Sequence, residues 1–246
     1  MTVKRNPKQA GTNFWDCIVQ TGPCPMNCNQ CFYNRPGAYY VSPDELPLIP
    51  DPEEVGDGIV RMNCGHDSNV EFEKVIEAAS RYKHAFFNTS IPKIAHFPGP
   101  VVLTANPREE ERPIIVAPPP NNLMFVRLRV SGTNLYWIDM AVDYYTGWKV
   151  PVVITMMAYY DQKPNVNENE VNGPGGDLTV TQCYEWRVRH INSYWCPTPA
   201  LIRAVMDRYA DNRLVTLCGC LNSYFCRDCR NCETYYFQTQ KRLRGE

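Results

Sequence analysis

Short apolar segments alternate with amphipathic segments along most of this chain. Residues 70–82 carry apolar side chains at a helical period, and Thr198 followed by Pro199 is typical of a helix start, so we expect helices at 70–82, 133–145 and 198–209. Strands that alternate with helices predict an α/β fold with a mainly parallel sheet. The segments of strand type lie at 14–20, 58–63, 84–88, 100–104, 123–130, 150–157 and 214–217.

Polar, Pro-rich or Gly-rich stretches separate these elements. Residues 43–55 and 165–177 read as loops, and the connection 90–99 is too short and too rich in proline for a full crossover helix. The last stretch, 218–246, differs from the rest in composition. We therefore divide the chain into an α/β domain, 1–217, and a cysteine-rich tail, 218–246.

Composition narrows the class of protein. The chain has 246 residues, of which 44% are hydrophobic and 21% charged, as in an ordinary globular protein. The net charge of −1 argues against a general nucleic-acid binder, which would carry a basic excess. Apolar runs fall far short of the roughly 20 residues that cross a bilayer, which predicts no membrane span. The polar N-terminus lacks the apolar core of a secretory signal, so we expect a cytoplasmic protein.

Cysteine is the unusual component, with 12 residues in the chain. Most of them fall in two dense groups, each directly after a predicted strand. A disulfide framework would spread its cysteines along a small secreted chain, so dense groups favour metal binding. The carboxyl ends of parallel strands meet at one edge of a sheet, which predicts that both groups open onto the same face. The first group is Cys24, Cys28 and Cys31, and the second is Cys218, Cys220, Cys226, Cys229 and Cys232.

The first group has the spacing C-x3-C-x2-C in Cys24-Pro-Met-Asn-Cys28-Asn-Gln-Cys31. Three thiolates on one loop can hold three irons of a [4Fe-4S] cluster and leave the fourth iron open. A zinc site would need a fourth ligand, for which Cys17 is the nearest earlier thiol. With its strand context, this motif resembles that of the radical S-adenosylmethionine (SAM) enzymes.

The resemblance implies an incomplete β/α barrel of about six mainly parallel strands. It also implies a [4Fe-4S] cluster with an open iron, and SAM that is cleaved reductively to a 5′-deoxyadenosyl radical. A flavodoxin- or ferredoxin-like protein would donate the electron. The substrate stays open between a small molecule and a peptide. The alternative is a non-catalytic zinc- or iron–sulfur-binding protein, acting as an electron carrier or docking module.

The resemblance also suggests residues that contact SAM. A Gly-Gly-Glu-like turn follows the second strand in that family, and here Asn63-Cys64-Gly65-His66-Asp67 keeps one glycine and offers Asp67 as the acid. At the end of strand 123–130, Arg129 and Ser131 are candidates for the SAM carboxylate and its surroundings. One position departs from the family, because Gln30 stands where an aromatic residue often precedes the third cysteine.

The second group supplies five thiols, one more than a closed metal site needs. Its C-x2-C-x2-C run resembles ferredoxin ligation, and many radical SAM enzymes carry an auxiliary cluster in a C-terminal extension. We expect a second [4Fe-4S] cluster, with zinc as the competing metal. The expected ligands are Cys226, Cys229, Cys232 and either Cys218 or Cys220.

Overall fold

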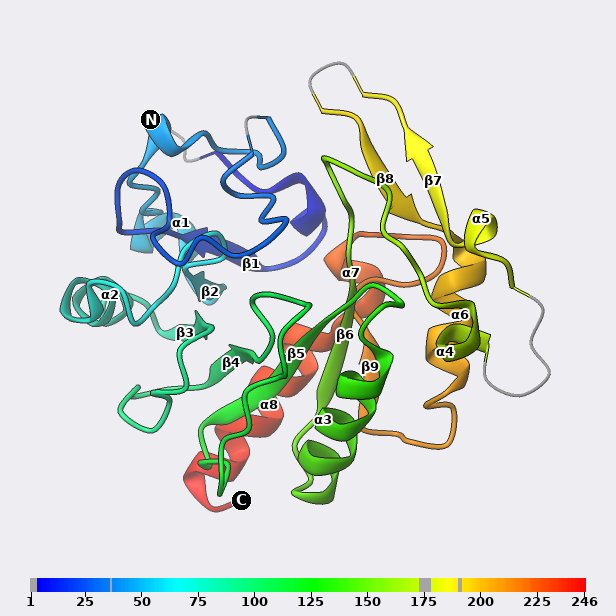
Figure 1. Ribbon diagram of the computed structural model, residues 1–246. Helices are drawn as coiled ribbons and strands as arrows, with labels where there is room; N and C mark the ends of the chain where they lie inside the picture. Colours follow the sequence, from blue (N-terminus) through cyan, green and yellow to red (C-terminus); the bar gives the residue numbers. More distant parts are fainter. Residues whose placement is uncertain (1–3, 36, 173–177, 190–191) are drawn as a thin grey trace.

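Seven parallel strands form the main sheet in the order β1-β2-β3-β4-β5-β6-β9. The computed structural model describes residues 4–35, 37–172, 178–189 and 192–246 (Figure 1). The α/β class and the parallel sheet predicted from the sequence are confirmed. The strands are β1 (Phe14–Cys17), β2 (Ile59–Met62), β3 (His84–Thr89), β4 (Val101–Thr104), β5 (Leu123–Val130), β6 (Val152–Met156) and β9 (Val215–Leu217).

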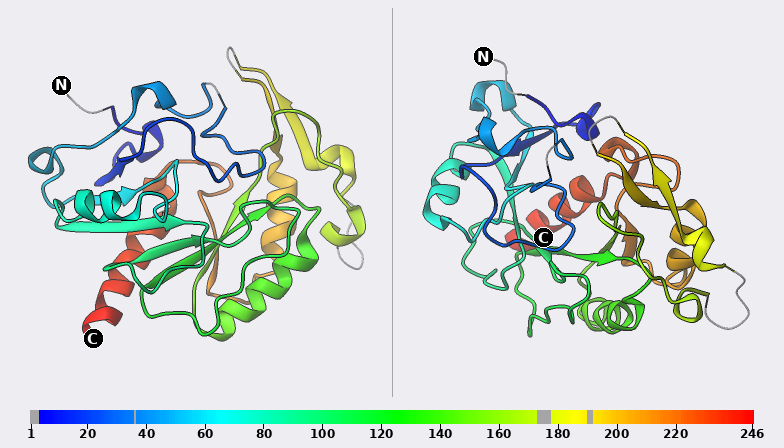
Figure 2. Two further views of the ribbon diagram at one scale, coloured as in Figure 1. Left: turned by 60° about the vertical axis from the view of Figure 1, so that its left-hand side comes forward. Right: turned by 45° about the horizontal axis from the view of Figure 1, so that its top comes forward.

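The strand order follows the chain without reversal, so each crossover passes over the same face of the sheet. On that face lie α2 (Phe72–Ala79), α3 (Leu135–Gly147) and α6 (Pro199–Asp207), which bury their apolar sides in one large core (Figures 1 and 2). A sheet wound in one direction has its helices on one side, as in a β/α barrel. With β1 and β9 as free edges, the architecture is consistent with an incomplete barrel.

The opposite face of the sheet carries a layer of apolar side chains. The C-terminal helix α8 (Asn231–Arg244) covers this layer with Tyr235 and Tyr236. Figure 1 shows this helix in red against the sheet. The tail thus ends as part of the main body. The layer under α8 consists of Phe14, Ile59, Phe86, Val102, Met124, Phe125 and Val153.

Local chemistry explains several boundaries. Thr198 caps α6 as predicted, because its hydroxyl accepts from the Leu201 N–H at 3.3 Å, with a proline in the first turn. Between β3 and β4 the described chain has no helix, as the short connection predicted. Among the described residues, no helix is long and apolar enough to cross a membrane.

The sequence did not predict the antiparallel hairpin of β7 (Tyr184–Arg187) and β8 (Tyr194–Pro197). It stands beyond the carboxyl ends of the strands, next to the cysteine loop (Figures 1 and 2). Of the predicted loop 165–177, residues 173–177 lie outside the described residues. The remaining elements are short: η1 (Pro7–Gln9), η2 (Pro43–Glu45), α1 (Pro52–Val55), α4 (Glu168–Asn172), α5 (Val180–Cys183) and α7 (Cys226–Cys229).

Candidate metal and cofactor site

The first cysteine group lies on the loop that leaves the carboxyl end of β1. A small core of Ile18, Tyr33, Val41 and Leu48 supports this loop, and the side chains of Cys24 and Cys31 pack against it. The ring of Tyr33 lies directly on the backbone of Gly65, where any Cβ would overlap it. Glycine is therefore required at this point of the turn after β2.

The three thiols share one neighbourhood. Burial raises the pKa of Cys24 to about 12, and Asp67, Cys28 and Cys31 add to the increase. Burial also raises the pKa of Cys28, followed by the effect of Cys31, while Arg129 opposes the shift. Mutual repulsion between thiolates is what a bound cation removes, so this donor set fits a group held by three thiolates.

Arg129, at the end of β5, ties this loop to the sheet. Its guanidinium donates to the carbonyl oxygens of Asn29 and Pro107, and its Nε lies 3.1 Å from the sulfur of Met157. Because these bonds occupy both ends of the guanidinium, the observed role of Arg129 is to position the cysteine loop. The predicted contact with SAM remains a prediction.

Glu109 places a carboxylate beside this arginine. Its side chain is 1% exposed, and its Oε2 lies 3.5 Å from Arg129 Nη2. Burial raises the pKa of Glu109, although Tyr159 and Arg129 lower it. Glu109 was not among the predicted site residues, because it lies within a run of charged residues, 108–112, that is typical of a turn or short helix.

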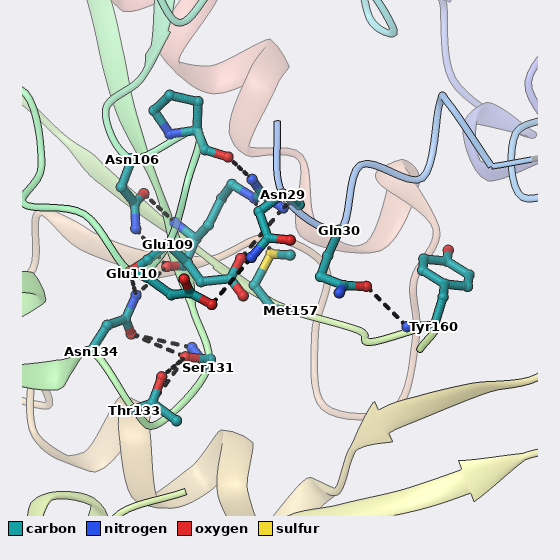
Figure 3. A network of polar contacts seen from close by, with 12 residues as sticks. Asn29, Gln30, Asn106, Glu109, Glu110, Ser131, Thr133, Asn134, Met157 and Tyr160 are labelled. Atoms are coloured by element: carbon teal, nitrogen blue, oxygen red, sulfur yellow. Dashed lines mark hydrogen bonds and ion pairs between the residues drawn. The ribbon is translucent and has the colours of Figure 1, made fainter. Parts of the chain in front are cut away.

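A second set of bonds joins the cysteine loop to the segment after β6. Gln30 accepts from the Tyr160 N–H at 3.1 Å and donates to Asp161 at 3.3 Å (Figure 3). Arg35 forms an ion pair with the same aspartate. Gln30, which departs from the family pattern, therefore holds the loop over the sheet edge by polar contacts.

Asp67 lies at the turn after β2 and acts on the pKa of Cys24 in the cysteine loop. Its Oδ1 accepts from the Asn69 N–H at 2.9 Å and from the Thr89 hydroxyl at 2.8 Å. Its Oδ2 accepts from the N–H and hydroxyl of Ser90 at 2.7 Å and 2.9 Å. Both oxygens thus join the ends of β2 and β3, and this role does not require SAM.

The two other strand-end candidates differ in their surroundings. Ser131 is buried, and its hydroxyl lies 2.7 Å from that of Thr133 (Figure 3). Arg127 points to the same face as Arg129 and reaches two neutral oxygens, on Asn88 at 3.4 Å and on Thr104 at 3.5 Å. Its half-buried cation makes Arg127 a candidate for an anionic ligand.

Below the loop, Asp16 of β1 and Arg61 of β2 form an ion pair at 2.8 Å with side chains 0% and 10% exposed. Burial would raise the pKa of Asp16, but Arg61 and hydrogen bonds from Asn6 and Gln9 lower it overall. In the sequence, each of these two charges interrupts an otherwise apolar strand. In the sheet, the two residues are direct partners across β1 and β2.

The second cysteine group extends from the end of β9 to the start of α8. Cys218 and Cys226 both act on the pKa of Cys232 after burial and Arg61, and Cys218 and Cys229 both raise the pKa of Cys226, likewise after burial and Arg61. Cys220 and Cys229 line a separate shallow pocket beside α6, together with Arg203, Met206 and Asp207. Between these thiols, Arg230 has a φ of 53° and separates α7 from α8.

As they stand, no three His, Cys, Asp or Glu side chains in the described ranges lie close enough together to hold a metal ion. The thiols would have to move closer together to bind one metal ion.

In comparisons with known proteins, no family model, no curated protein and no solved structure matches this chain.

Proposed function

We propose that this protein is a radical SAM enzyme whose three-cysteine loop holds a [4Fe-4S] cluster. The observation that carries the proposal is the position of Cys24, Cys28 and Cys31 after β1 of a parallel, singly wound sheet. When bound, such a cluster supplies an open iron and the electron that splits SAM into methionine and a 5′-deoxyadenosyl radical. Substrate ligands in such sheets bind beyond the carboxyl ends of the strands.

The chain's own residues would orient and shield this chemistry. Arg129 and Gln30 fix the cysteine loop against the ends of β5 and β6 through the bonds described above. Asp67 holds the ends of β2 and β3 together, and Arg127 offers a cation to a carboxylate. We propose a flavodoxin- or ferredoxin-like protein as the electron donor and a small molecule or a peptide as the substrate.

The test is SAM cleavage by anaerobically reconstituted protein with a chemical reductant. We expect 5′-deoxyadenosine from the wild-type chain and none from Cys28→Ala, since loss of one ligand leaves too few thiolates for the cluster. Cys196→Ser, on β8, is the matched control and should retain the activity. Iron and sulfide kept by Cys28→Ala in the full wild-type amount per chain, or zinc without sulfide in the wild-type protein, would instead support a non-catalytic metal-binding protein, since a second site alone would keep only part of the iron.

The proposal includes a second metal site built from the thiols after β9, with a [4Fe-4S] cluster or zinc as the bound group. Four thiolates close such a site, so it would bind no substrate through an open metal position.

A further inference from the structure

The hairpin of β7 and β8 is extended by the segment that follows β6. The N–H of Tyr159 donates to the Trp195 carbonyl at 3.0 Å, and the N–H of Trp195 donates back at 2.7 Å. Successive residues of an extended strand point to opposite faces, so this small sheet has two distinct faces. One face carries Tyr184 and Trp195, which pack on the main hydrophobic core. The other face is turned away from that core.

The face turned away from the core carries two tyrosine rings between guanidinium groups. The ring centroids of Tyr160 and Tyr194 are 5.7 Å apart. The guanidinium carbon of Arg35 lies 5.6 Å from the centre of the Tyr160 ring, and that of Arg189 lies 5.0 Å from the centre of the Tyr194 ring. Arg187 is the cross-strand partner of Tyr194 and adds a third guanidinium. We call these five residues the tyrosine–arginine row.

The tyrosine–arginine row begins at the cysteine loop. Arg35 belongs to that loop, and Gln30 of the same loop accepts from the Tyr160 N–H at 3.1 Å (Figure 3). Tyr160 and Tyr194 are half-buried, whereas Arg189 at the far end is exposed. The row therefore leads from solvent to the loop that would hold the proposed cluster.

The charge of this region is positive, although that of the whole chain is not. The hairpin and the segments beside it carry four cationic side chains and two carboxylates among the described residues: Arg35, Lys163, Arg187, Arg189, Asp161 and Glu185. Arg35 and Arg187 pair with Asp161 and Glu185 at the surface, where an ion pair contributes little and can be exchanged for another anion. Arg189 contacts a ring and has no carboxylate partner in the part of the chain that the structure describes.

We propose that the tyrosine–arginine row binds single-stranded nucleic acid, and that such a strand is the substrate of the proposed enzyme. Unpaired bases stack on tyrosine rings and on guanidinium planes, and their phosphates pair with cations. A duplex hides the faces of its bases, and an acidic peptide carries its charge on side chains without rings. A base held at Tyr160 would lie beside the cysteine loop. The role as substrate rests on the proposed function, whereas the binding itself needs no cluster.

The first test measures binding by the full, metal-free chain to a fluorescent single strand of about 12 nucleotides. Fluorescence anisotropy should show saturable binding, with a dissociation constant between about 1 and 100 µM at physiological salt. Tyr194→Ala should weaken binding at least about fivefold, because one stacking platform is lost, and Tyr194→Phe should retain it. The matched control is Tyr136→Ala on α3, whose side chain is 63% exposed and should not affect binding.

Two further measurements test the charge and the position of the strand. Arg189→Gln should weaken binding and reduce the slope of log affinity against log salt by about 0.7, whereas Arg81→Gln, at an exposed position after α2, should change neither. In the wild-type chain, a strand that contains bromouridine should cross-link under ultraviolet light to Tyr160 or Tyr194, mapped by mass spectrometry. This measurement does not depend on how well a variant folds.

The inference is wrong if binding does not saturate up to about 100 µM protein. It is also wrong if a duplex or an acidic peptide binds as tightly as the single strand, or if Tyr194→Ala and Tyr136→Ala act alike. SAM cleavage by the reconstituted chain is measured separately. If the chain forms 5′-deoxyadenosine but binds no strand, the proposed enzyme stands and this substrate is excluded. If it binds the strand but never cleaves SAM, the proposed enzyme and the substrate role both fail, and only the nucleic-acid surface stands.

Discussion

Asp16 receives hydrogen bonds from five side chains that come from three parts of the chain. Arg61 on β2 donates at 2.8 Å, and the other four donors are Asn6, Gln9, Tyr39 and Tyr40. The two tyrosines belong to the segment that follows the cysteine loop. This one carboxylate thus connects the N-terminal segment, the sheet and the cysteine loop.

Asp16→Asn should lower the free energy of unfolding by about 3–5 kcal/mol, because it leaves the Arg61 cation buried without its counter-charge. Chemical denaturation of the metal-free chain measures the change. Asp16→Asn combined with Arg61→Met should recover part of the loss, since the unpaired charge is then gone. Asp57→Asn, which breaks the exposed pair with Lys83, is the control and should leave the unfolding midpoint unchanged. An equal effect of Asp16→Asn and Asp57→Asn would contradict this role.

The same pair predicts the response to acid. The pKa of Asp16 is lowered in the folded protein from a value of 3.8, so the carboxylate contributes its full stabilisation above that value. This contribution is lost as the pH falls below about 4 and the folded-state pKa is passed. The wild-type chain should therefore lose more stability than Asp16→Asn between pH 5 and roughly pH 2 in the same denaturation experiment.

At the scale of elements, α8 covers the apolar layer on one face of the sheet, the face that would line the interior of a closed barrel. Tyr236 is 1% exposed, its ring lies tilted 6.3 Å from that of Phe86, and its hydroxyl is 3.2 Å from His84 Nδ1. Phe237, the next residue, is 47% exposed. Neighbouring aromatic residues on one helix thus differ in whether they face the sheet.

Tyr236→Ala should destabilise the chain by about 3 kcal/mol or more, because it removes a fully buried ring and leaves a cavity. Tyr236→Phe, which removes only the hydroxyl contacts, should cost about 1 kcal/mol. Phe237→Ala is the matched control and should change the stability by less than about 0.5 kcal/mol. Urea unfolding followed by circular dichroism measures all three. If Tyr236→Ala behaves like Phe237→Ala, α8 does not pack on the sheet as described.

The helices and strands that were predicted correctly have a strong local signal. Strand 123–130 is found at its predicted bounds as β5, because it is apolar throughout except for two arginines on one face. Helix α8 was missed because only Tyr235, Tyr236 and Thr239 are buried in a segment that is otherwise polar. The hairpin of β7 and β8 was missed although Tyr184-Glu-Trp-Arg-Val-Arg189 alternates apolar and charged side chains, the pattern of a half-exposed strand.

The same limit on prediction applies to the candidate site, where the sequence does not indicate contacts between distant parts of the chain. The cysteine spacing was readable because its members are close in sequence. The ion pair of Arg35 with Asp161 was not, since these two residues lie far apart in the sequence. Likewise, the family pattern suggested Asp67 and Arg129 as SAM contacts, whereas their hydrogen bonds to strand ends and to the cysteine loop required coordinates.

For the molecule as a whole, both cysteine groups lie at the same end of the sheet, and two segments carry most of their thiols. These are the cysteine loop, 21–35, and the start of the tail, 218–232, which join the first and last strands to the rest of the site. The main hydrophobic core lies on the face of the sheet that α2 and α3 cover. Metal binding should therefore act on the strand-end segments far more than on that core.

Iron–sulfur reconstitution should raise the thermal midpoint by several degrees relative to the metal-free chain, because the metal binds the folded state in preference to the unfolded one. Amide hydrogen exchange should slow in 21–35 and 218–232 and stay unchanged in α3, whose helix packs on the opposite face. Replacing Cys24, Cys28 and Cys31 by serine should abolish the added protection at 21–35 and preserve it at 218–232. Protection that disappears from both segments in this variant would mean that the two groups of thiols form a single metal site.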